Sequence, residues 1–242
     1  MNIVTIIPSR LASTRLPNKA LADINGLPMI VHVWRRGIEA DLGPVIVACG
    51  DKAIAGAIRD VGGEAVMTDP RLNSGSDRVF AALEAVDPAG KYEVIVNLQG
   101  DMPTANPTML TTLVAPLRRP GAEVATLASV IAAPNERLSD SVVKVAVSMP
   151  PGSKAGRAIY FSRNTIPWGG GEHYHHIGLY AYRRDALTRF SQLPPSPLEQ
   201  REKLEQLRAL EHGMRIDISI VDVNPLGVDT LDDLNIARSL LV

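Results

Sequence analysis

The sequence predicts an α/β fold with a mostly parallel central sheet, helices on both faces and a smaller mixed β lobe. In the first half, short apolar runs rich in Val and Ile alternate with amphipathic segments of helical length. Such alternation is typical of parallel strands joined by crossover helices, which cover both faces of the sheet. The second half carries extended segments of alternating polarity, and these indicate the mixed lobe.

The elements of the first half follow one another in a regular order. The predicted strands cover residues 3–7, 45–49, 64–67 and 93–98. The predicted helices cover residues 28–40, 52–61, 76–86 and 107–118. Asp51 is placed to cap the second of these helices, and Gly62-Gly63 is placed to end it.

The second half is predicted to mix strands and helices. Extended segments at 124–132 and 142–147 are separated by Pro134, and a further strand covers 176–182. A proline-rich break at 193–197 precedes a periodic helix. That helix is predicted over 198–211, with one apolar face formed by Leu198, Leu204, Leu207 and Leu210. A strand at 215–221 and a helix at 231–241 complete the pattern.

Composition excludes several classes of protein. The chain has 242 residues, of which 45% are hydrophobic and 21% charged, as is usual for a globular protein with a sizeable core. A net charge of −1 and an aromatic content of 4% disfavour a nucleic-acid partner. No apolar run approaches the roughly 20 residues that cross a bilayer, and no basic leader or cleavage site begins the chain. We therefore expect a cytoplasmic protein with no membrane partner and with Cys49 as a buried thiol.

A basic loop follows the first predicted strand. It spans residues 9–19 and carries three cations, Arg10, Arg15 and Lys19. Ligands of open α/β sheets bind at the carboxyl ends of strands, so this loop is a candidate phosphate cradle to which amides of residues 12–14 could contribute. Arg15 and Lys19 could neutralise a triphosphate, although a solvated basic loop is the alternative. The loop lacks the glycine spacing of a Walker motif.

Two aspartates are candidate ligands for Mg²⁺. Asp101 follows the strand at 93–98, and Gly100 before it would allow a close approach of the backbone. Asp229 precedes a capping box formed by Thr230 and Asp233, which leaves its carboxylate free to point into a site. Two carboxylates from distant segments are a common way to hold Mg²⁺ against phosphates. The alternative for Asp101 is a cap of the following turn.

Two further motifs have both structural and functional interpretations. The segment Asn73–Arg78 can cap a helix that starts near Ser76, and its small residues can also contact a nucleobase edge. If residues 173–176 are extended, His173 and His175 lie on one face of the strand and His176 on the other, which does not favour a zinc site.

Several blocks, in order along nearly the whole chain, resemble the 3-deoxy-manno-octulosonate cytidylyltransferase family. These blocks are IPSRLASTRLPNK at 7–19, NSGSDR at 73–78, NLQGD at 97–101, YFSRNTIP at 160–167, HIGLY at 176–180, LEQLR at 204–208 and GVDT at 227–230. The resemblance implies a three-layer nucleotide-diphospho-sugar transferase-like fold. It also implies that CTP and 3-deoxy-D-manno-octulosonate (Kdo) react with Mg²⁺ to give CMP-Kdo and pyrophosphate. A cytoplasmic homodimer serving lipopolysaccharide biosynthesis is implied as well.

The resemblance also assigns roles to individual residues. Arg10, Arg15 and Lys19 would bind the triphosphate, and Ser74 and Gly75 would lie beside the cytosine. The remaining roles are metal binding by Asp101 and Asp229, and sugar-acid binding by Gln99, Arg163, His176 and Glu205. The single domain 1–242 would divide into a nucleotide-binding half, 1–121, and a sugar-binding and dimerisation half, 122–242.

Departures from the family pattern leave alternatives open. Met102 stands where the family often has an acidic residue, and the segment between Pro167 and His176 is short and glycine-rich. The first departure leaves open whether that turn supplies a second metal ligand, and the second leaves open which octulosonate is preferred, including 8-amino-Kdo. A cytidylyltransferase for another acidic sugar, such as an N-acylneuraminate, is the alternative within the enzyme class, and a non-catalytic nucleotide-binding protein is the alternative from another class. Without the resemblance, Arg163 is expected in a surface salt bridge and Glu205 on a solvated helix face.

Overall fold

The computed structural model describes residues 1–13 and 15–241. It divides into two compact units, one formed by residues 1–111 with 225–242 and the other by residues 112–224. The boundary falls within α4 (Pro107–Val114), which a 3-10 turn, η2 (Ala115–Arg118), continues. The sequence-based division at residue 121 placed 225–242 in the second half, whereas in the structure this segment packs with the first unit.

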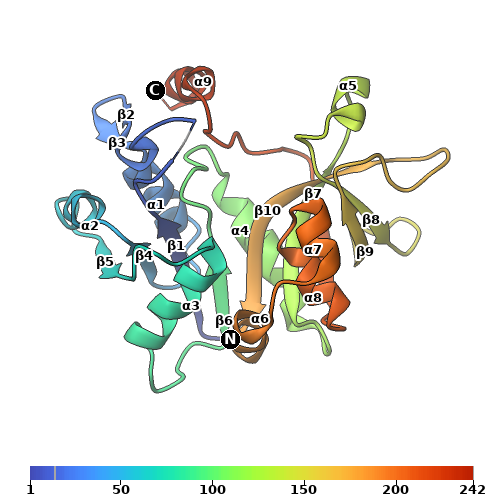
Figure 1. The fold of residues 1–242 in the computed structure, drawn as a ribbon, viewed down its shortest axis with the longest axis horizontal. Coiled ribbons are helices and arrows are strands. Elements are labelled where there is room, and N and C mark those ends of the chain that lie inside the picture. Colours follow the sequence, from blue (N-terminus) through green and yellow to red (C-terminus); the bar gives the residue numbers. More distant parts are fainter. Residues whose placement is uncertain (14, 242) are drawn as a thin grey trace. The chain divides into compact units, whose positions relative to one another are not determined.

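The first unit is built on four parallel strands. They are ordered β5 (Glu64–Met67), β4 (Val45–Cys49), β1 (Ile3–Ser9) and β6 (Val94–Asn97) (Figure 1). Every residue of β1, β4 and β6 is buried, which explains why these strands are continuous apolar runs in the sequence. Cys49 is buried as predicted, and burial raises the pKa of its thiol.

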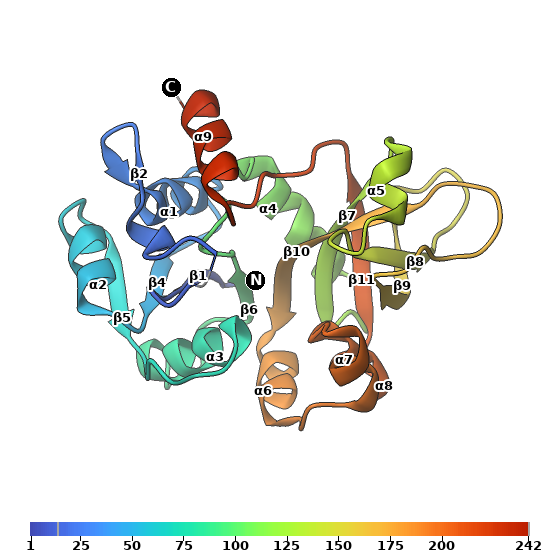
Figure 2. The ribbon, with the colours of Figure 1, turned by 45° about the horizontal axis from the view of Figure 1, so that its top comes forward.

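Three helices connect these strands and cover both faces of the sheet, as predicted. α1 (Met29–Glu39) lies in the connection from β1 to β4, and α2 (Lys52–Arg59) connects β4 to β5 at the edge of the sheet. α3 (Gly75–Val86) returns across the sheet to β6, and a right-handed return in the opposite direction places it on the other face. Figure 2 shows α1 and α3 on opposite sides of the strands.

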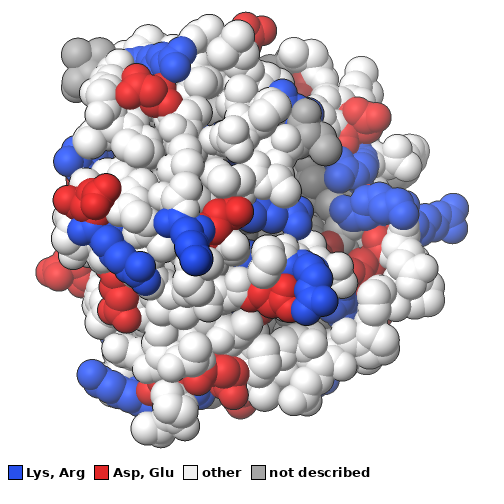
Figure 3. All heavy atoms as spheres, turned by 60° about the vertical axis from the view of Figure 1, so that its left-hand side comes forward, with Lys and Arg blue, Asp and Glu red and all other residues white. Residues whose placement is uncertain are grey.

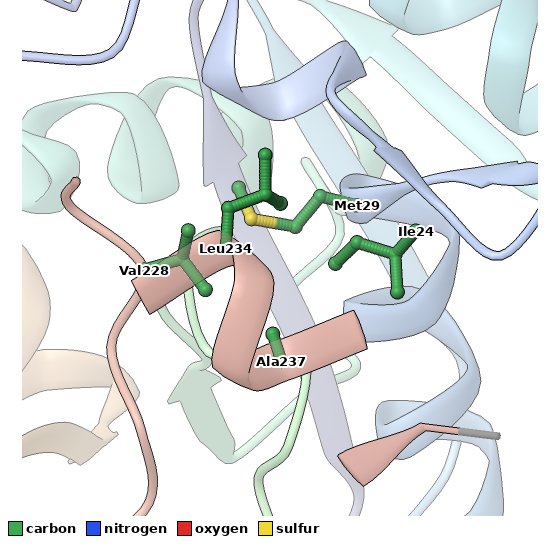
Figure 4. Packing of buried hydrophobic residues seen from close by; sticks show 5 residues of the cluster. All are labelled: Ile24, Met29, Val228, Leu234 and Ala237. Atoms are coloured by element: carbon green, nitrogen blue, oxygen red, sulfur yellow. The ribbon is translucent and has the colours of Figure 1, made fainter. Parts of the chain in front are cut away.

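The last helix, α9 (Leu231–Leu240), packs against the segment that follows β1 (Figures 1 and 2). That segment comprises η1 (Lys19–Leu21), β2 (Asp23–Ile24) and β3 (Leu27–Pro28). The contact is a hydrophobic cluster of five buried residues, shown in Figure 4, which are Ile24, Met29, Val228, Leu234 and Ala237. Burial of these side chains fixes the C-terminal segment to the first unit.

The second unit contains the mixed β lobe that the sequence predicts. Its strands are ordered β10 (Tyr174–Arg183), β7 (Val124–Val130), β11 (Ile216–Val221), β9 (Ala155–Ser162) and β8 (Lys144–Ser148). β11 runs parallel to β7, whereas β10 with β7, β11 with β9 and β8 with β9 are antiparallel pairs. α5 (Pro134–Leu138) lies in the connection between β7 and β8.

The second unit also departs from the predicted elements. The predicted helix over 198–211 is two helices, α7 (Pro197–Glu202) and α8 (Gln206–Glu211). Lys203 ends α7 in the left-handed conformation, with φ of 59°, so the helical repeat of the leucines is interrupted. β9 and α6 (Arg184–Gln192) were not anticipated, because their polar residues obscure the strand and helix periods.

The surface carries charges of both signs. On the face shown in Figure 3, Lys and Arg side chains are interspersed with Asp and Glu among uncharged residues. This mixture accords with the net charge of −1. Among residues 1–13 and 15–241, no helix has the length and apolar character needed to span a bilayer.

Replacement of Gly100 by alanine tests the predicted close approach of the backbone. A Cβ at this position would lie 2.6 Å from the carbonyl oxygen of Pro8, inside van der Waals contact. Gly100→Ala is expected to lower the free energy of unfolding by about 1–3 kcal/mol. The matched control is Gly56→Ala within α2, where a Cβ meets nothing within 4 Å and stability should rise by about 0.5–1 kcal/mol. Urea unfolding midpoints measure both, and equal midpoints for the two variants would contradict the steric argument.

Candidate functional site

A cavity of about 360 Å³ opens in the first unit, where the strands β1 and β6 end. Its walls come from the loop after β1, the start of α3, the turn after β6 and the segment before α9. Eight of the eleven residues to which the resemblance assigns a role line it, namely Arg10, Arg15, Lys19, Ser74, Gly75, Gln99, Asp101 and Asp229. The structure therefore brings together segments that lie far apart in the chain.

Lys19 lies between the two candidate metal carboxylates. Its Nζ donates to Oδ2 of Asp101 at 2.9 Å and to Oδ1 of Asp229 at 2.8 Å. Burial by itself lowers the pKa of Lys19, but the charges and hydrogen bonds of the two carboxylates outweigh it, so the pKa lies above its ordinary value. The ammonium therefore stays protonated and offsets the repulsion between the carboxylates.

The other two cations of the loop lie nearer to solvent. Arg15 donates from Nη2 to Oδ2 of Asp229 at 2.8 Å, with 66% of its side chain exposed. Arg10 is exposed and lines the same cavity. An exposed ion pair contributes little to stability, so breaking the contact of Arg15 with Asp229 in favour of an anionic ligand costs little free energy.

Backbone contacts hold both aspartates in place. The N–H of Val228 donates to the carbonyl oxygen of Asp101 at 2.9 Å, which joins the two segments directly before Asp229. The predicted capping box of Thr230 and Asp233 is present, and Oδ2 of Asp233 also accepts from the N–H of Asp229 at 3.0 Å. Partial burial raises the pKa of Asp233, but these hydrogen bonds outweigh it and lower the pKa below its ordinary value.

Asp51 differs from its predicted role. It occupies the N-cap position of α2, but its side chain makes no capping hydrogen bond. Its Oδ2 accepts instead from the N–H of Leu11 at 2.9 Å and so anchors the start of the basic loop. Leu16 anchors the other end by packing against the cluster around α9. Of the expected amide donors at residues 12–14, Thr14 lies outside the described residues.

The start of α3 forms another wall of the cavity. Ser74 is the N-cap of α3, and its Oγ accepts from the N–H of Asp77 at 3.0 Å. This hydrogen bond confirms the predicted helix cap. Gly75 begins the helix, and a Cβ there would lie 3.8 Å from Oε1 of Gln99. Arg78 also lines the cavity but was not singled out from the sequence. Its spacing of four residues from Ser74, one helical turn, was the available signal.

Arg163 belongs to the second unit, where it follows β9. Its guanidinium donates to two backbone carbonyl oxygens, those of Glu202 at 3.1 Å and Asp140 at 2.9 Å. Within the described chain no carboxylate pairs with this guanidinium, so the expected surface salt bridge is not formed and the positive charge remains uncompensated. The Glu202 carboxylate accepts instead from Ser162 Oγ and from the Arg163 N–H. The buried Nζ of Lys144 donates to the Arg163 carbonyl oxygen, which further fixes this backbone.

His176 and Glu205 also lie in the second unit. The His176 ring is buried, and its Nε2 lies 3.0 Å from Oγ1 of Thr126. Burial, and then the neighbouring His175, lower its pKa to about 3. Glu205 is half-buried at the N-cap of α8 rather than on a solvated face. Burial and the charges of Tyr182 and Glu205 hold the pKa of Tyr180 well above its ordinary value.

The first-unit cavity has the chemistry of a site for a polyanion and a divalent cation. Asp101 and Asp229 both reach one nitrogen within 3 Å, so one cation can contact both carboxylates. Carboxylate oxygens suit Mg²⁺, which completes its shell with water and phosphate oxygens. In the described part of the chain, no three His, Cys, Asp or Glu side chains gather at one metal site.

Comparison with known proteins gives consistent results. Residues 4–216 match the sequence profile of a family described as cytidylyltransferase. A 3-deoxy-manno-octulosonate cytidylyltransferase of Paramagnetospirillum magneticum is 57% identical over 98% of this chain and 97% of its own length. One from Parvibaculum lavamentivorans is 58% identical over 98% and 92%, respectively.

Solved structures agree with this relationship. The structure of CMP:2-keto-3-deoxy-manno-octonic acid synthetase complexed with CTP matches with a TM-score of 0.92 and 38% identity, covering 100% of this chain and 98% of that one. A putative glucose-1-phosphate thymidylyltransferase from Bacillus anthracis matches with a TM-score of 0.64 and 16% identity, covering 98% and 94%. The second match concerns the fold alone, and together they confirm the predicted nucleotidyltransferase-like α/β fold.

The buried ring of His176 predicts a loss of stability in acid. The folded protein keeps the ring neutral down to about pH 3, whereas the unfolded chain protonates it below its ordinary pKa of 6.5. The unfolded state then binds more protons, so the stability present above pH 6.5 is lost as the pH falls, by up to about 1.4 kcal/mol per pH unit. Urea unfolding from about pH 7.5 to about pH 4.5 should show a shallower slope for His176→Gln than for the unchanged protein. His212→Gln, at an exposed position, is the matched control, and equal slopes for all three proteins would refute the prediction.

Proposed function

The chain belongs to the cytidylyltransferase family, and we propose that it transfers CMP from CTP to the anomeric hydroxyl of Kdo. The products are CMP-Kdo and pyrophosphate. The observation that carries the proposal is the contact of Lys19 with Asp101 and Asp229 in a cavity whose lining includes three arginines and several small residues. Relatives with 57% and 58% identity bear the name of the Kdo enzyme, which supports the choice of sugar.

Arg10, Arg15 and Lys19 bind the triphosphate in this proposal. Their charges neutralise the phosphates of CTP and the pyrophosphate that leaves, and charge-assisted hydrogen bonds orient the chain of phosphates. The anomeric oxygen attacks the α-phosphorus in line with the leaving pyrophosphate, so that a bond from this oxygen to phosphorus forms as the bond to the pyrophosphate oxygen breaks, and the hydroxyl proton passes to solvent. Catalysis then comes from positioning and charge neutralisation rather than from a covalent intermediate on the protein.

Asp101 and Asp229 hold Mg²⁺ in this proposal. When bound there, Mg²⁺ would supply positive charge for the phosphates and would lower the pKa of the attacking hydroxyl. The two aspartates fit this role because one small cationic group already contacts both of them. Lys19 gains phosphate oxygens as alternative acceptors when CTP enters, which leaves the carboxylates available to the metal.

Gln99, Arg163, His176 and Glu205 contact the sugar acid in this proposal. The uncompensated guanidinium of Arg163 suits the carboxylate of Kdo, because fork-shaped donors match carboxylate oxygens. Ser74 and Gly75 lie by the cytosine. We further propose a homodimer that acts in the cytoplasm in lipopolysaccharide biosynthesis.

A substrate panel tests the proposed function. The protein is incubated with CTP, with and without Mg²⁺, and with Kdo, 8-amino-Kdo or an N-acylneuraminate, and released pyrophosphate is measured. We expect release with CTP, Kdo and Mg²⁺ together. Release with the neuraminate and not with either octulosonate would reject the proposed substrate. If none of the three acidic sugars gives release, the proposed reaction is rejected.

Removal of either metal carboxylate should abolish most turnover. Asp101→Asn and Asp229→Asn each remove a negative oxygen ligand, and a metal contribution of several kcal/mol corresponds to a loss of about 10²–10³-fold in kcat. The control is Asp232→Asn, at an exposed position on the first turn of α9. Near-normal turnover of Asp101→Asn, measured by pyrophosphate release, would exclude the proposed metal site.

Replacement of Arg163 by lysine tests the sugar-acid contact. Arg163→Lys keeps the charge but loses the fork of donors, so the KM for Kdo should rise about 10–100-fold while the KM for CTP stays the same. The matched control is Arg157→Lys, at an exposed position on β9. Initial rates at varied Kdo and CTP give both constants, and an unchanged KM for Kdo would contradict the assignment.

A further inference from the structure

The ring of His176 is held on several sides within the second unit. It is buried, with the ring of Phe161 at 4.8 Å in an edge-to-face arrangement and the ring of Tyr180 at 5.5 Å. Its Nε2 lies 3.0 Å from Oγ1 of Thr126, a buried residue of β7. Because these contacts fix the ring, the nitrogen that carries the proton decides which ligand group the ring can bind.

The hydroxyl of Thr126 has more partners than it has hydrogens. The pairing of β10 with β7 shifts in register between Ile177 and Tyr180. At this bulge, Oγ1 of Thr126 donates to the carbonyl oxygens of Leu179 at 2.8 Å and Ile177 at 3.1 Å. A carbonyl oxygen can only accept, so the single hydroxyl hydrogen is committed to these two groups. Thr126 therefore has no hydrogen to donate to His176, and its Oγ1 accepts from the Nε2–H of the ring.

This arrangement leaves Nδ1 of His176 as an acceptor. Burial, and then the neighbouring His175, lower the pKa of the ring to about 3, so near neutral pH the ring carries one proton, on Nε2. Nδ1 has no hydrogen-bond partner in the described part of the chain, and it is not closed off from solvent. A bare ring nitrogen accepts from a hydroxyl, whereas it offers a carboxylate no hydrogen.

We infer that Thr126 positions His176 with its proton on Nε2, so that Nδ1 accepts a hydrogen bond from a hydroxyl of the sugar acid. This inference rests on the proposed function, because it takes His176 as a contact of the sugar. Arg163 and His176 then serve different groups of one substrate, since the guanidinium donates to the carboxylate and the imidazole accepts from a hydroxyl. With the opposite tautomer, Nδ1–H would donate and would suit the carboxylate instead. Thr126 is a positioning residue, because it acts through the ring.

The ring nitrogens of the unchanged protein test the tautomer directly. The five histidines are labelled with ¹⁵N, and two-bond ¹H–¹⁵N correlations are recorded at about pH 7.5 without substrates. The resonances of His176 are identified by their absence from His176→Gln. We expect a protonated Nε2 and a bare Nδ1. A protonated Nδ1, or a mixture of the two tautomers, would overturn the inference.

Two variants of Thr126 test its control of the ring. Thr126→Val keeps the shape of the side chain but removes the acceptor of Nε2–H, so protonation at Nδ1 should become visible in the same spectrum. Thr126→Ser is the matched control, because it keeps the hydroxyl and should keep the tautomer of the unchanged protein. An unchanged tautomer in Thr126→Val would show that Thr126 does not set it and would overturn the inference.

Steady-state kinetics of the same variants test the contact with the sugar. The loss of one oriented hydrogen bond should raise the KM for Kdo about 3–10-fold in Thr126→Val, while the KM for CTP stays the same and Thr126→Ser changes neither by more than about twofold. An unchanged KM for Kdo, or equal changes for Kdo and CTP, would show a merely structural role and would overturn the inference. The spectra need no substrate and the first of them no variant of Thr126. A failure of transfer to Kdo therefore remains distinguishable from a wrong tautomer.

Discussion

The contact of one ammonium group with two carboxylates organises the candidate site. Asp101 and Asp229 come from distant parts of the chain, and their charges would repel one another if nothing stood between them. Lys19 offsets this repulsion and remains protonated because the same carboxylates raise its pKa. The site is therefore assembled around a balance of charge, which an anionic nucleotide and a divalent cation can replace with a balance of the same kind.

Hydrophobic packing makes this charge cluster possible. Leu234 and Ala237 of α9 pack on Ile24 and Met29 (Figure 4). Leu16 of the basic loop packs against the same cluster. The cluster thus supports both the segment that carries Asp229 and the loop that carries Lys19. The hydrophobic effect holds these segments together but is non-directional. The capping box at the start of α9 fixes the direction of the chain there. The two together position the carboxylate of Asp229.

The second unit supports its charged residue in a different way. Glu202 accepts from the hydroxyl of Ser162 and from the N–H of Arg163, so a carboxylate that could have neutralised the guanidinium is used to hold the backbone. The guanidinium itself donates to two backbone carbonyl oxygens. This arrangement orders Arg163 without pairing its guanidinium with a carboxylate of the described residues.

The sequence by itself determined the elements whose signals are local. The apolar runs of β4 and β5 match their predicted ranges, and the caps at Ser74 and Thr230 follow from residues within one turn. Its motifs also indicated eight residues that line the cavity, since these lie after a strand or at the start of a helix. The metal, sugar and nucleotide roles of those residues stay predictions.

Only the tertiary structure decided the features that depend on distant partners. Lys203 divides the predicted helix into α7 and α8, Asp51 serves the N–H of Leu11 instead of its own helix, and Arg78 is buried against the cavity. No local pattern predicts the first two outcomes, and the one-turn spacing of Arg78 from Ser74 does not by itself predict its burial. Each is set by which group of another segment lies within hydrogen-bonding or packing distance, and that is a property of the folded chain.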